Sequence, residues 1–253
     1  MSKRLAYPYL AWIVGFIIIP ILFICYYGLT RDGHFTFSNI AAITENVHWI
    51  PLVLSVRLSL ICVVICLLIS IPLGLALRSI RSRFLVFLFM MPMWMNTVLS
   101  ILAWKLLLGT NGIIGRLFHV RSILNTQLAT EIGMVYDLLP FAIIPIYNAF
   151  ASIDDSIIDA AYDLGADRAQ VLTKIMLPGA KAGILSAVVM VFVPALTSFV
   201  ISDMLGGGKV SLIGNVIEQE FTNSMDWNLG SGLGMVLMVF VLLSTMLLRG
   251  GES

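Results

Sequence analysis

Long uncharged apolar stretches are the feature of this sequence that most limits how it can fold. Several of them contain about 20 residues, which is the length that an α-helix needs to cross the hydrocarbon core of a bilayer. One further stretch of that length contains a single carboxylate, Asp137. The sequence therefore predicts an all-α polytopic membrane protein with six transmembrane helices in a single domain, residues 1–253. The predicted spans are residues 10–29, 58–77, 84–104, 132–150, 183–203 and 229–248.

The composition agrees with a bilayer and excludes two other classes of protein. Hydrophobic residues make up 59% of the chain and charged residues 11%, whereas soluble domains average about 45–50% and about 25%. This excludes an ordinary soluble enzyme. The net charge is only +1, without a concentrated basic face, so no nucleic-acid partner is expected. The cysteines, Cys25, Cys62 and Cys66, lie within apolar stretches, which favours packing over a metal site.

Basic residues indicate which ends of the predicted helices face the cytoplasm. Cytoplasmic loops retain Lys and Arg, and with both termini inside, nine basic residues are cytoplasmic and six are not. A tight cluster, Arg78, Arg81 and Arg83, lies in one predicted six-residue cytoplasmic loop. The first span follows Lys3 and Arg4 and is too long for the apolar region of a signal peptide. We therefore expect a retained first helix and two cytoplasmic termini.

Proline is common within the predicted spans. Each proline in a helix removes a backbone hydrogen bond and tends to kink the helix. Two interpretations stay open, namely irregular packing and a bundle that bends around a substrate path. The prolines concerned are Pro20, Pro72, Pro92, Pro140, Pro145 and Pro194.

A polar stretch, residues 151–182, separates the fourth and fifth predicted spans on the cytoplasmic side. Asp154 and Asp155 suit a helix N-terminus, because the helix dipole favours negative charge there. Apolar positions then follow helical spacing at i, i+4 and i+7: Ile157, Ala161 and Leu164. A nearly bare patch, where another surface can approach closely, is formed by Ala160, Ala161 and Gly165. We predict a short amphipathic helix that is offered to a partner.

The same stretch contains a spaced motif. It reads Asp159-Ala160-Ala161, three residues, Gly165, nine residues, Ile175-Met176-Leu177-Pro178. This resembles the cytoplasmic signature of the permeases of ATP-binding-cassette (ABC) importers, Glu-Ala-Ala, three residues, Gly, nine residues, Ile-x-Leu-Pro, with Asp in place of Glu. The resemblance implies the type I ABC importer permease fold and a coupling helix that docks in a groove of a separate ATPase subunit. The residues that it assigns to coupling are Asp159, Ala160, Ala161, Leu164, Gly165, Ile175, Leu177 and Pro178.

The sequence offers no phosphate-binding loop for ATP. Gly206-Gly207-Gly208-Lys209 lacks the spacing of a Walker A motif and follows a predicted span on the outer side. The resemblance then implies that ATP and Mg are bound by the partner ATPase. On this chain we expect no cofactor, no metal and no catalytic residue.

Further segments narrow the resemblance to the spermidine/putrescine permease family, of the PotB type. The segments are Met91-Pro92-Met93-Trp94-Met95-Asn96, Leu138-Leu139-Pro140-Phe141, Ile201-Ser202-Asp203-Met204-Leu205-Gly206-Gly207 and Leu212-Ile213-Gly214-Asn215-Val216-Ile217. Asp137 departs from this pattern, since an apolar residue is expected there. The resemblance implies a polyamine importer in the bacterial cytoplasmic (inner) membrane. It also implies a second homologous permease subunit, two ATPase subunits and an extracytoplasmic polyamine-binding protein as partners.

Two alternatives to a polyamine permease remain open. One is an ABC importer permease for another small solute, since the coupling motif does not determine which substrate is transported. The other is an intramembrane lipid-modifying enzyme, which would need clustered Asp or His side chains on facing helices. A secondary transporter is disfavoured because it should show an inverted repeat.

Carboxylates and aromatic rings near the spans are the candidates for substrate contact. A carboxylate in a transmembrane segment costs roughly 2.5–3.5 kcal/mol on insertion scales, so it normally marks a pathway. Aromatic faces attract ammonium groups through cation–π interactions. The candidates are Asp137, Asp203, Trp94, Asn96, Tyr136 and Trp104. Other roles stay open, namely Trp94 and Trp104 as interfacial or packing residues, Asp203 as a helix cap or partner of Lys209, and Asp137 as a partner of Lys105.

Overall fold

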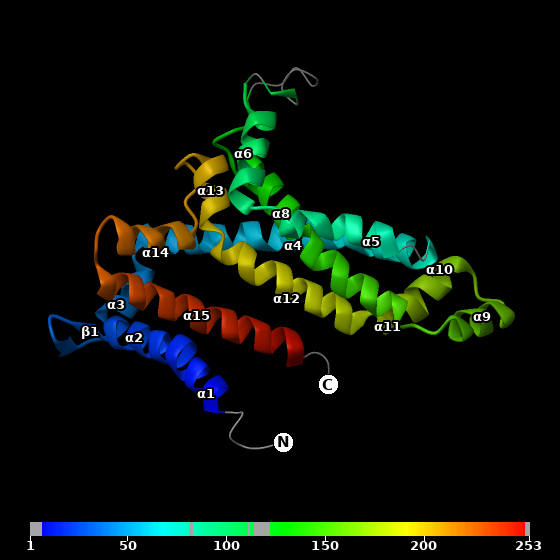
Figure 1. Cartoon of the computed structure of the whole chain (residues 1–253), viewed down its shortest axis with the longest axis horizontal. Coiled ribbons are helices and arrows are strands. Elements are labelled where there is room, and N and C mark those ends of the chain that lie inside the picture. Colours follow the sequence, from blue (N-terminus) through cyan, green and yellow to red (C-terminus); the bar gives the residue numbers. More distant parts are fainter. Residues whose placement is uncertain (1–6, 81–82, 111, 114–121, 251–253) are drawn as a thin grey trace.

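The computed structural model describes residues 7–80, 83–110, 112–113 and 122–250, and most of them are helical (Figure 1). Lys3, Arg4 and Arg81, on which the predicted orientation partly depends, lie outside the described residues. The first helical segment comprises α1 (Tyr7–Ile13), the π-helical turn η2 (Val14–Ile18) and α2 (Ile19–Gly28). A two-stranded antiparallel hairpin follows, in which β1 (Thr30–Arg31) pairs with β2 (His34–Phe35). The short helices α3 (Ser38–Ala41) and η3 (Ala42–Thr44) then lead into α4 (Asn46–Ile80).

Three helices form the core of the molecule. The long helix α4 and α12 (Lys181–Thr197) both pack along α8 (Gln127–Ala151) and against each other. Helices α4 and α8 approach each other closely at Gly74, which has no side chain. A Cβ atom there would lie 3.0 Å from Cγ2 of Ile146. The largest fully buried side chains of this core include Phe150, Ile146, Met134, Leu196 and Leu205. Interlocking apolar side chains therefore hold α4, α8 and α12 as one packed unit.

The described residues contain four helices long and apolar enough to cross a membrane, or up to six spans if two bent pairs each count as one. The single helices are Pro8–Gly28, Asn46–Ile80, Gln127–Ala151 and Trp227–Leu247. Helix α4 begins at Asn46, well before the predicted span 58–77. Arg57 and Pro51, which precede that span, are both within the helix. The single helix Trp227–Leu247 belongs to α15 (Trp227–Gly250), which packs against α2 and α14 (Ile213–Thr222).

The predicted span over residues 84–104 is sharply bent. The chain forms α5 (Arg83–Met90), a 3₁₀ turn η4 (Met91–Trp94) and α6 (Thr97–Leu108), and the two arms of this pair meet at 93°. Pro92 opens the 3₁₀ turn, and Met95 and Asn96 are extended. Proline cannot donate an amide hydrogen, so the α-helical hydrogen bonds stop here.

The predicted span 183–203 is also divided. Helix α12 ends at Thr197, Ser198 leaves the helical region with ψ 89°, and α13 (Phe199–Gly206) continues in a different direction (Figure 1). Pro194 lies one turn before this break and removes another helical hydrogen bond. Both interruptions bring loops and helix ends to one side of α8, since α13 contacts α6 and α8.

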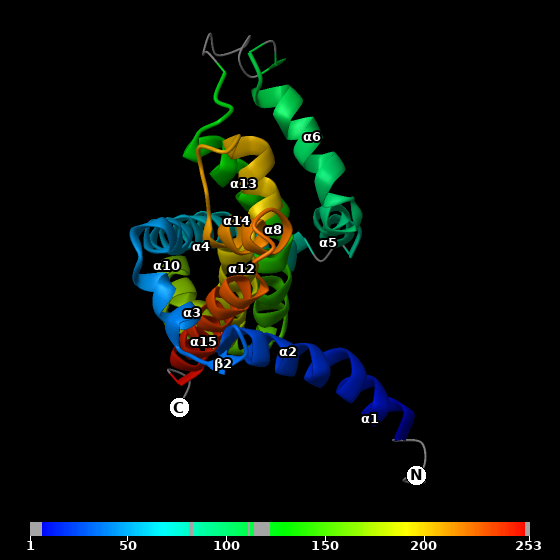
Figure 2. The same cartoon turned by 90° about the vertical axis from the view of Figure 1, so that its left-hand side faces the viewer.

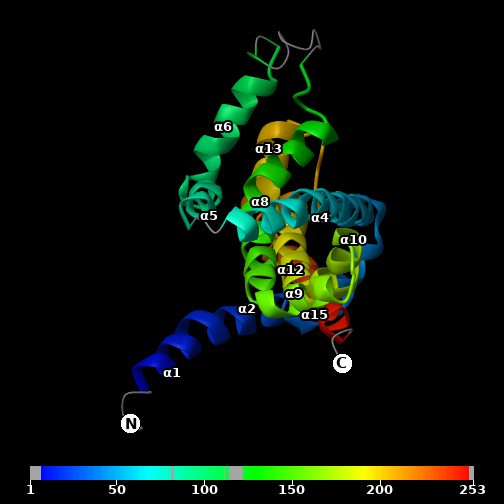
Figure 3. The ribbon, with the colours of Figure 1, turned by 90° about the vertical axis from the view of Figure 1, so that its right-hand side faces the viewer.

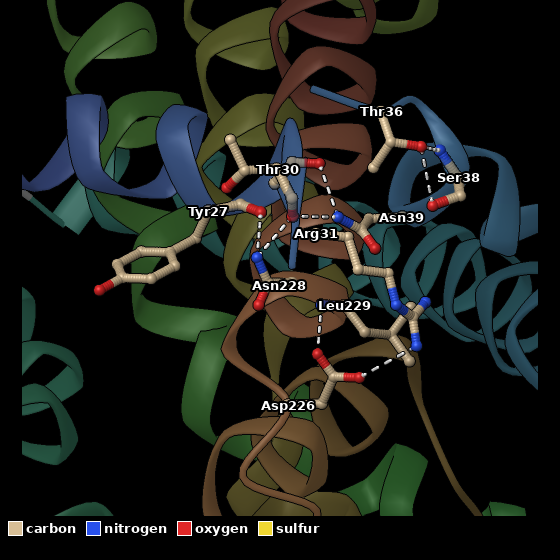
Figure 4. A network of polar contacts seen from close by, with 10 residues as sticks. Tyr27, Thr30, Arg31, Thr36, Ser38, Asn39, Asp226, Asn228 and Leu229 are labelled. Atoms are coloured by element: carbon tan, nitrogen blue, oxygen red, sulfur yellow. Dashed lines mark hydrogen bonds and ion pairs between the residues drawn. The ribbon is translucent and has the colours of Figure 1, made fainter. Parts of the chain in front are cut away.

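Polar contacts tie the first helical segment to the start of the last helix (Figure 4). The Asn228 amide donates hydrogen bonds to the carbonyls of Tyr27, at 3.1 Å, and of Thr30. The buried Asn39 amide donates to the carbonyls of Gly28 at 3.2 Å and Thr30 at 3.0 Å. The end of α2 and the hairpin are thereby fastened to α15. The other end of this segment, α1, extends away from the bundle (Figure 2).

Candidate functional site

Two regions at different ends of the molecule contain the candidate residues. The first is the segment after α8, which forms α9 (Asp155–Asp163), α10 (Arg168–Val171), the π-helical turn η5 (Leu172–Met176) and α11 (Leu177–Gly179). In Figure 1, α9 lies beyond the end of α8, and Figure 3 views the molecule from this side. The second region lies where α6, α8 and α13 meet.

Helix α9 begins at a side-chain cap. The Asp154 carboxylate accepts a hydrogen bond of 2.9 Å from the Ser156 amide. This bond, the main cause, lowers the pKa of the Asp154 carboxyl group below its ordinary value. Asp155 follows in the first turn, where the helix dipole favours its charge. The N-terminus predicted at this aspartate pair is therefore present.

Helix α9 ends in a Schellman motif that requires glycine. Gly165 adopts a left-handed conformation with φ 85°. Its amide donates to the Tyr162 carbonyl at 2.9 Å, and the Ala166 amide donates to the Ala161 carbonyl at 3.0 Å. These two bonds satisfy the last carbonyls of the helix. A Cβ atom at Gly165 would meet nothing within 4 Å, so the backbone conformation, rather than crowding within this chain, requires the glycine.

The exposed face of α9 differs in one residue from the predicted patch. Leu164 is 90% exposed and Ile157 is 52% exposed, and Asp159, Ala160 and Gly165 are exposed beside them. Ala161 is buried against the molecule at 9% exposure, so it is not part of the bare patch. Helical spacing places residues 157 and 161 on the same side of α9. Of the two, however, only residue 161 is packed against the rest of the molecule.

The rest of the motif lies in the turns that lead into α12. Ile175 is in η5 and is half-buried, while Leu177 is half-buried in α11 and packs against the core. Pro178 is exposed. It lies before the fifth span, because α12 begins at Lys181 after a bend of 63°. Proline therefore lies in the last turn before the bend and not in the first turn of the long helix.

The second region brings several predicted pathway residues together. The rings of Trp104 and Tyr136 meet edge to face, with centroids 5.4 Å apart. The Tyr136 hydroxyl donates to the sulfur of Met95 at 3.9 Å. The side chain of Thr97, at the start of α6, lies close to the Asp137 carboxylate of α8. A carboxylate, a phenol and an indole thus lie at the contact between α6 and α8.

Three other predicted pathway residues lie apart from this group. Trp94 is 72% exposed in η4 and contacts the ring of Phe87 at 5.4 Å. The side-chain oxygen of Asn96 accepts a 3.2 Å hydrogen bond from the Leu99 amide, which makes Asn96 the N-cap of α6. Asp203 is exposed within α13. Among the described residues, no ion pair or ring contact joins these three side chains to Asp137.

The alternative structural roles of the two aspartates are contradicted. Ion pairs among the described residues are Arg31 with Asp226 and Arg78 with Asp155, so neither Asp137 with Lys105 nor Asp203 with Lys209 forms one. Asp203 is not a helix cap either, since it lies inside α13 (Phe199–Gly206). The exposed position of Lys105 on α6 explains why it does not reach Asp137.

One buried carboxylate was missed by the sequence analysis. Glu131 lies in the second turn of α8, is 6% exposed, and neither carboxylate oxygen has a hydrogen-bond partner among the described residues. The helix that contains it packs along α4. The predicted span began at residue 132 and so excluded it. A span drawn from Gln127 would have included Glu131 as a second intramembrane carboxylate.

The described residues give no support for a metal site. The described residues contain no group of three His, Cys, Asp or Glu side chains that could hold a metal ion.

Comparisons with known proteins agree with this architecture. The curated relatives that the chain matches include two that are both named spermidine/putrescine transport system permease protein PotB. The Haemophilus influenzae relative is 36% identical over 250 residues, covering 92% of this chain and 87% of the relative. The Escherichia coli relative is 31% identical over 245 residues, covering 90% of this chain and 89% of the relative.

Solved structures show the same fold. A bacterial ABC transporter involved in the import of the acidic polysaccharide alginate matches with a TM-score of 0.76 at 16% identity, covering 97% of this chain and 94% of that one. A bacterial alginate ABC transporter in complex with an alginate pentasaccharide-bound periplasmic protein matches with a TM-score of 0.82 at 15% identity, covering 97% and 91%. These likenesses establish the type I ABC permease fold for this chain.

A family model covers most of the chain. It is the model described as binding-protein-dependent transport system inner membrane component, and it matches residues 66–249. This range includes the second part of α4, all of α8 and α12, the α9 segment and nearly all of α15. The chain therefore belongs to the family of inner membrane components of binding-protein-dependent transport systems.

Proposed function

We propose that this chain is the permease subunit of an ATP-driven importer for polyamines, spermidine or putrescine, and forms half of the translocation pathway. The observation that carries the proposal is 36% identity, along 92% of this chain, to a spermidine/putrescine permease. As a member of a transport family, the chain is a transport subunit and not an enzyme, so a lipid-modifying activity is not proposed.

The group of side chains at α6 and α8 supports a cationic substrate. A polyamine consists of ammonium groups separated by methylenes. The Asp137 carboxylate can pair with one ammonium group, and the adjoining rings of Trp104 and Tyr136 can bind another by cation–π contact and pack on the methylenes. Asp203 and Trp94, both exposed, and Asn96 remain candidates for contacts further along the path.

The exposed face of α9 supports coupling to a separate ATPase. Leu164 and Ile157 are apolar side chains that project from a short helix outside the long spans. Asp159, Ala160 and Gly165 are exposed as well, whereas Ile175 and Leu177 are half-buried and Pro178 is exposed in the turns before α12. In our proposal this face docks on the ATPase subunit, which binds ATP and Mg. The protein then resides in the bacterial inner membrane with α9 and both termini in the cytoplasm.

The proposed assembly contains a second homologous permease, two ATPase subunits and an extracytoplasmic binding protein that delivers the polyamine. A transporter with this fold has been solved in complex with its periplasmic protein, which supports the last of these partners. A loop after α13, Gly206–Lys209, is not proposed to bind nucleotide, because Gly207 and Gly208 form a left-handed turn after a helix rather than a loop before one.

A second candidate is an importer permease for a different small solute. The structural neighbours support it, because a transporter of the same fold is involved in the import of an acidic polysaccharide. Asp137 and Glu131, however, place carboxylates in α8, which disfavours an anionic solute.

The test is reconstitution of the complete transporter in proteoliposomes. The permease is co-expressed with its candidate partner subunits, and uptake of labelled spermidine and putrescine is measured with and without ATP. We expect the ATPase to copurify and uptake to require ATP and the binding protein. Copurification and stimulated ATP hydrolysis without polyamine uptake would favour the second candidate. Absence of any associated ATPase would contradict both.

A further inference from the structure

Arg78 joins two segments that are far apart in the sequence. It lies in the last turn of α4, and its Nη2 atom donates a hydrogen bond of 2.8 Å to the Ile153 carbonyl. The same nitrogen lies 2.8 Å from Oδ1 of Asp155, with which it forms an ion pair. Ile153 lies between α8 and α9, and Asp155 is the first residue of α9. One guanidinium group therefore holds the entrance of α9 against the end of α4.

This contact is better shielded than an ordinary surface ion pair. The Arg78 side chain is 18% exposed, although that of Asp155 is 53% exposed. Hydrogen bonds from a charged donor are shorter and stronger than neutral ones, and the Ile153 carbonyl adds a second acceptor with no rotamer freedom of its own. The position at the C-terminus of α4 also favours a positive charge.

The two sides of the contact differ in how firmly they are packed. The end of α4 is part of the core, since Leu77 is 2% exposed and Gly74 lies against Ile146 and Phe150 of α8. Helix α9, in contrast, is short, and among its residues only Ala161 is buried. Arg78 thus connects a lightly packed helix to a rigid one.

We propose that Arg78 is a positioning residue that transmits movement between α9 and the core helix α4. This inference rests on the proposed function, in which α9 docks on the ATPase. When the ATPase subunits displace α9, the bond to Ile153 and the ion pair with Asp155 carry the displacement to α4, and through its packing to α8 and α12. Without Arg78, α9 still docks but moves with less effect on the spans.

The test compares Arg78→Gln with Arg78→Lys and with Ser79→Ala as a matched control. Ser79 is the next residue, is exposed, and its hydroxyl bonds only the Ala76 carbonyl of its own helix. Each complex is reconstituted, and uptake and ATP hydrolysis are measured together. We expect Arg78→Gln to keep the ATPase bound while uptake per ATP hydrolysed falls about fivefold or more, the lower end of usual coupling between sites. Arg78→Lys keeps the positive charge but loses the planar guanidinium group, so its uptake per ATP hydrolysed should lie between those of Arg78→Gln and the wild type. Ser79→Ala should have the wild-type value.

A second measurement does not depend on transport. Amide hydrogen exchange in the purified permease should be faster over residues 153–157 in Arg78→Gln than in Ser79→Ala. If Arg78→Gln does not accumulate in the membrane, Arg78→Lys takes its place in both measurements. Unchanged uptake per ATP in a variant that assembles overturns the proposal, as does unchanged exchange over residues 153–157. A wild-type complex without polyamine uptake would instead contradict the proposed function, while the exchange measurement still tests the contact.

Discussion

At the scale of single residues, the backbone of Gly165 closes the end of α9, and Ala161 is the residue of this helix that is buried. Gly165 is predicted to allow close docking, yet its left-handed backbone is what this chain itself requires. Ala161 is predicted to be part of the docking patch but faces the core. The spacing of the motif predicted where α9 lies, but not which side of it is covered, because the covered side depends on how the helix packs against other parts of the chain, such as α10.

The first residue-scale prediction separates the two roles of Gly165. Asn tolerates the left-handed conformation, whereas Ala adopts it at a cost of roughly 1–2 kcal/mol. Gly165→Ala should therefore accelerate amide exchange at the end of α9, while Gly165→Asn should leave it near the wild type. If both variants lose ATPase binding equally, crowding at the docking surface decides the role of the residue. If only Gly165→Ala does, the backbone conformation decides it.

The second prediction concerns Asp137. Asp137→Asn keeps the contact with Thr97 and removes the charge, so the permease should assemble normally. Uptake at limiting polyamine should fall roughly tenfold, because about 1.4 kcal/mol of lost interaction changes an equilibrium constant tenfold. Lys105→Leu is the control and should leave both stability and uptake unchanged, since Lys105 is exposed and not paired with Asp137. Full uptake by Asp137→Asn would remove this residue from the pathway.

The third prediction concerns Glu131. A buried carboxyl group without a hydrogen-bond partner destabilises the folded protein, and an apolar side chain of similar size removes that cost. Glu131→Leu should therefore raise the midpoint of thermal unfolding of the purified permease. Glu131→Gln, which keeps polar atoms at the site, should not. A lower midpoint for Glu131→Leu would show that the carboxyl group has a stabilising partner in the folded protein.

At the scale of elements, the apolar stretches predicted which segments are helical but not where the helices bend. Residues 84–104 contain one proline, and the sequence left open whether the prolines of the spans mean irregular packing or a bundle that bends around a substrate path. The 93° bend depends on the extended Met95 and on the cap at Asn96 as well as on Pro92. The break at Ser198 likewise depends on contacts of α13 with α14 that join residues distant from the proline.

A buried polar network holds the segment after that break. The Asn215 side chain accepts from the Leu212 amide at 3.0 Å and from the Ser202 hydroxyl, and donates to the Phe199 carbonyl at 3.0 Å. Asn215→Ala should leave these groups unsatisfied and destabilise the permease by about 1–3 kcal/mol for each buried group left without a partner. Thermal unfolding of the purified protein measures this loss. Asn223→Ala, at an exposed helix end, is the control and should change little.

At the scale of the whole molecule, much of the apolar surface has no cover within this chain. None of the most apolar 18-residue window of Pro8–Gly28 is buried, and large apolar side chains such as Phe16, at 72%, and Leu22, at 59%, are exposed there. Lipid covers part of such a surface. The remainder is available to the second permease of the proposed assembly, because α1 extends away from the other helices of its own chain (Figure 2).

The last prediction follows from that exposed surface. A partner that binds only the folded permease stabilises it by mass action. The permease purified together with the second permease subunit should therefore unfold at a higher temperature than the permease alone in the same detergent and lipid. Dilution of the pair should lower this temperature, whereas dilution of the isolated chain should not. Equal unfolding temperatures for the pair and the single chain would mean that lipid alone covers the first helical segment, and that the two permeases meet through a surface too small to stabilise either one.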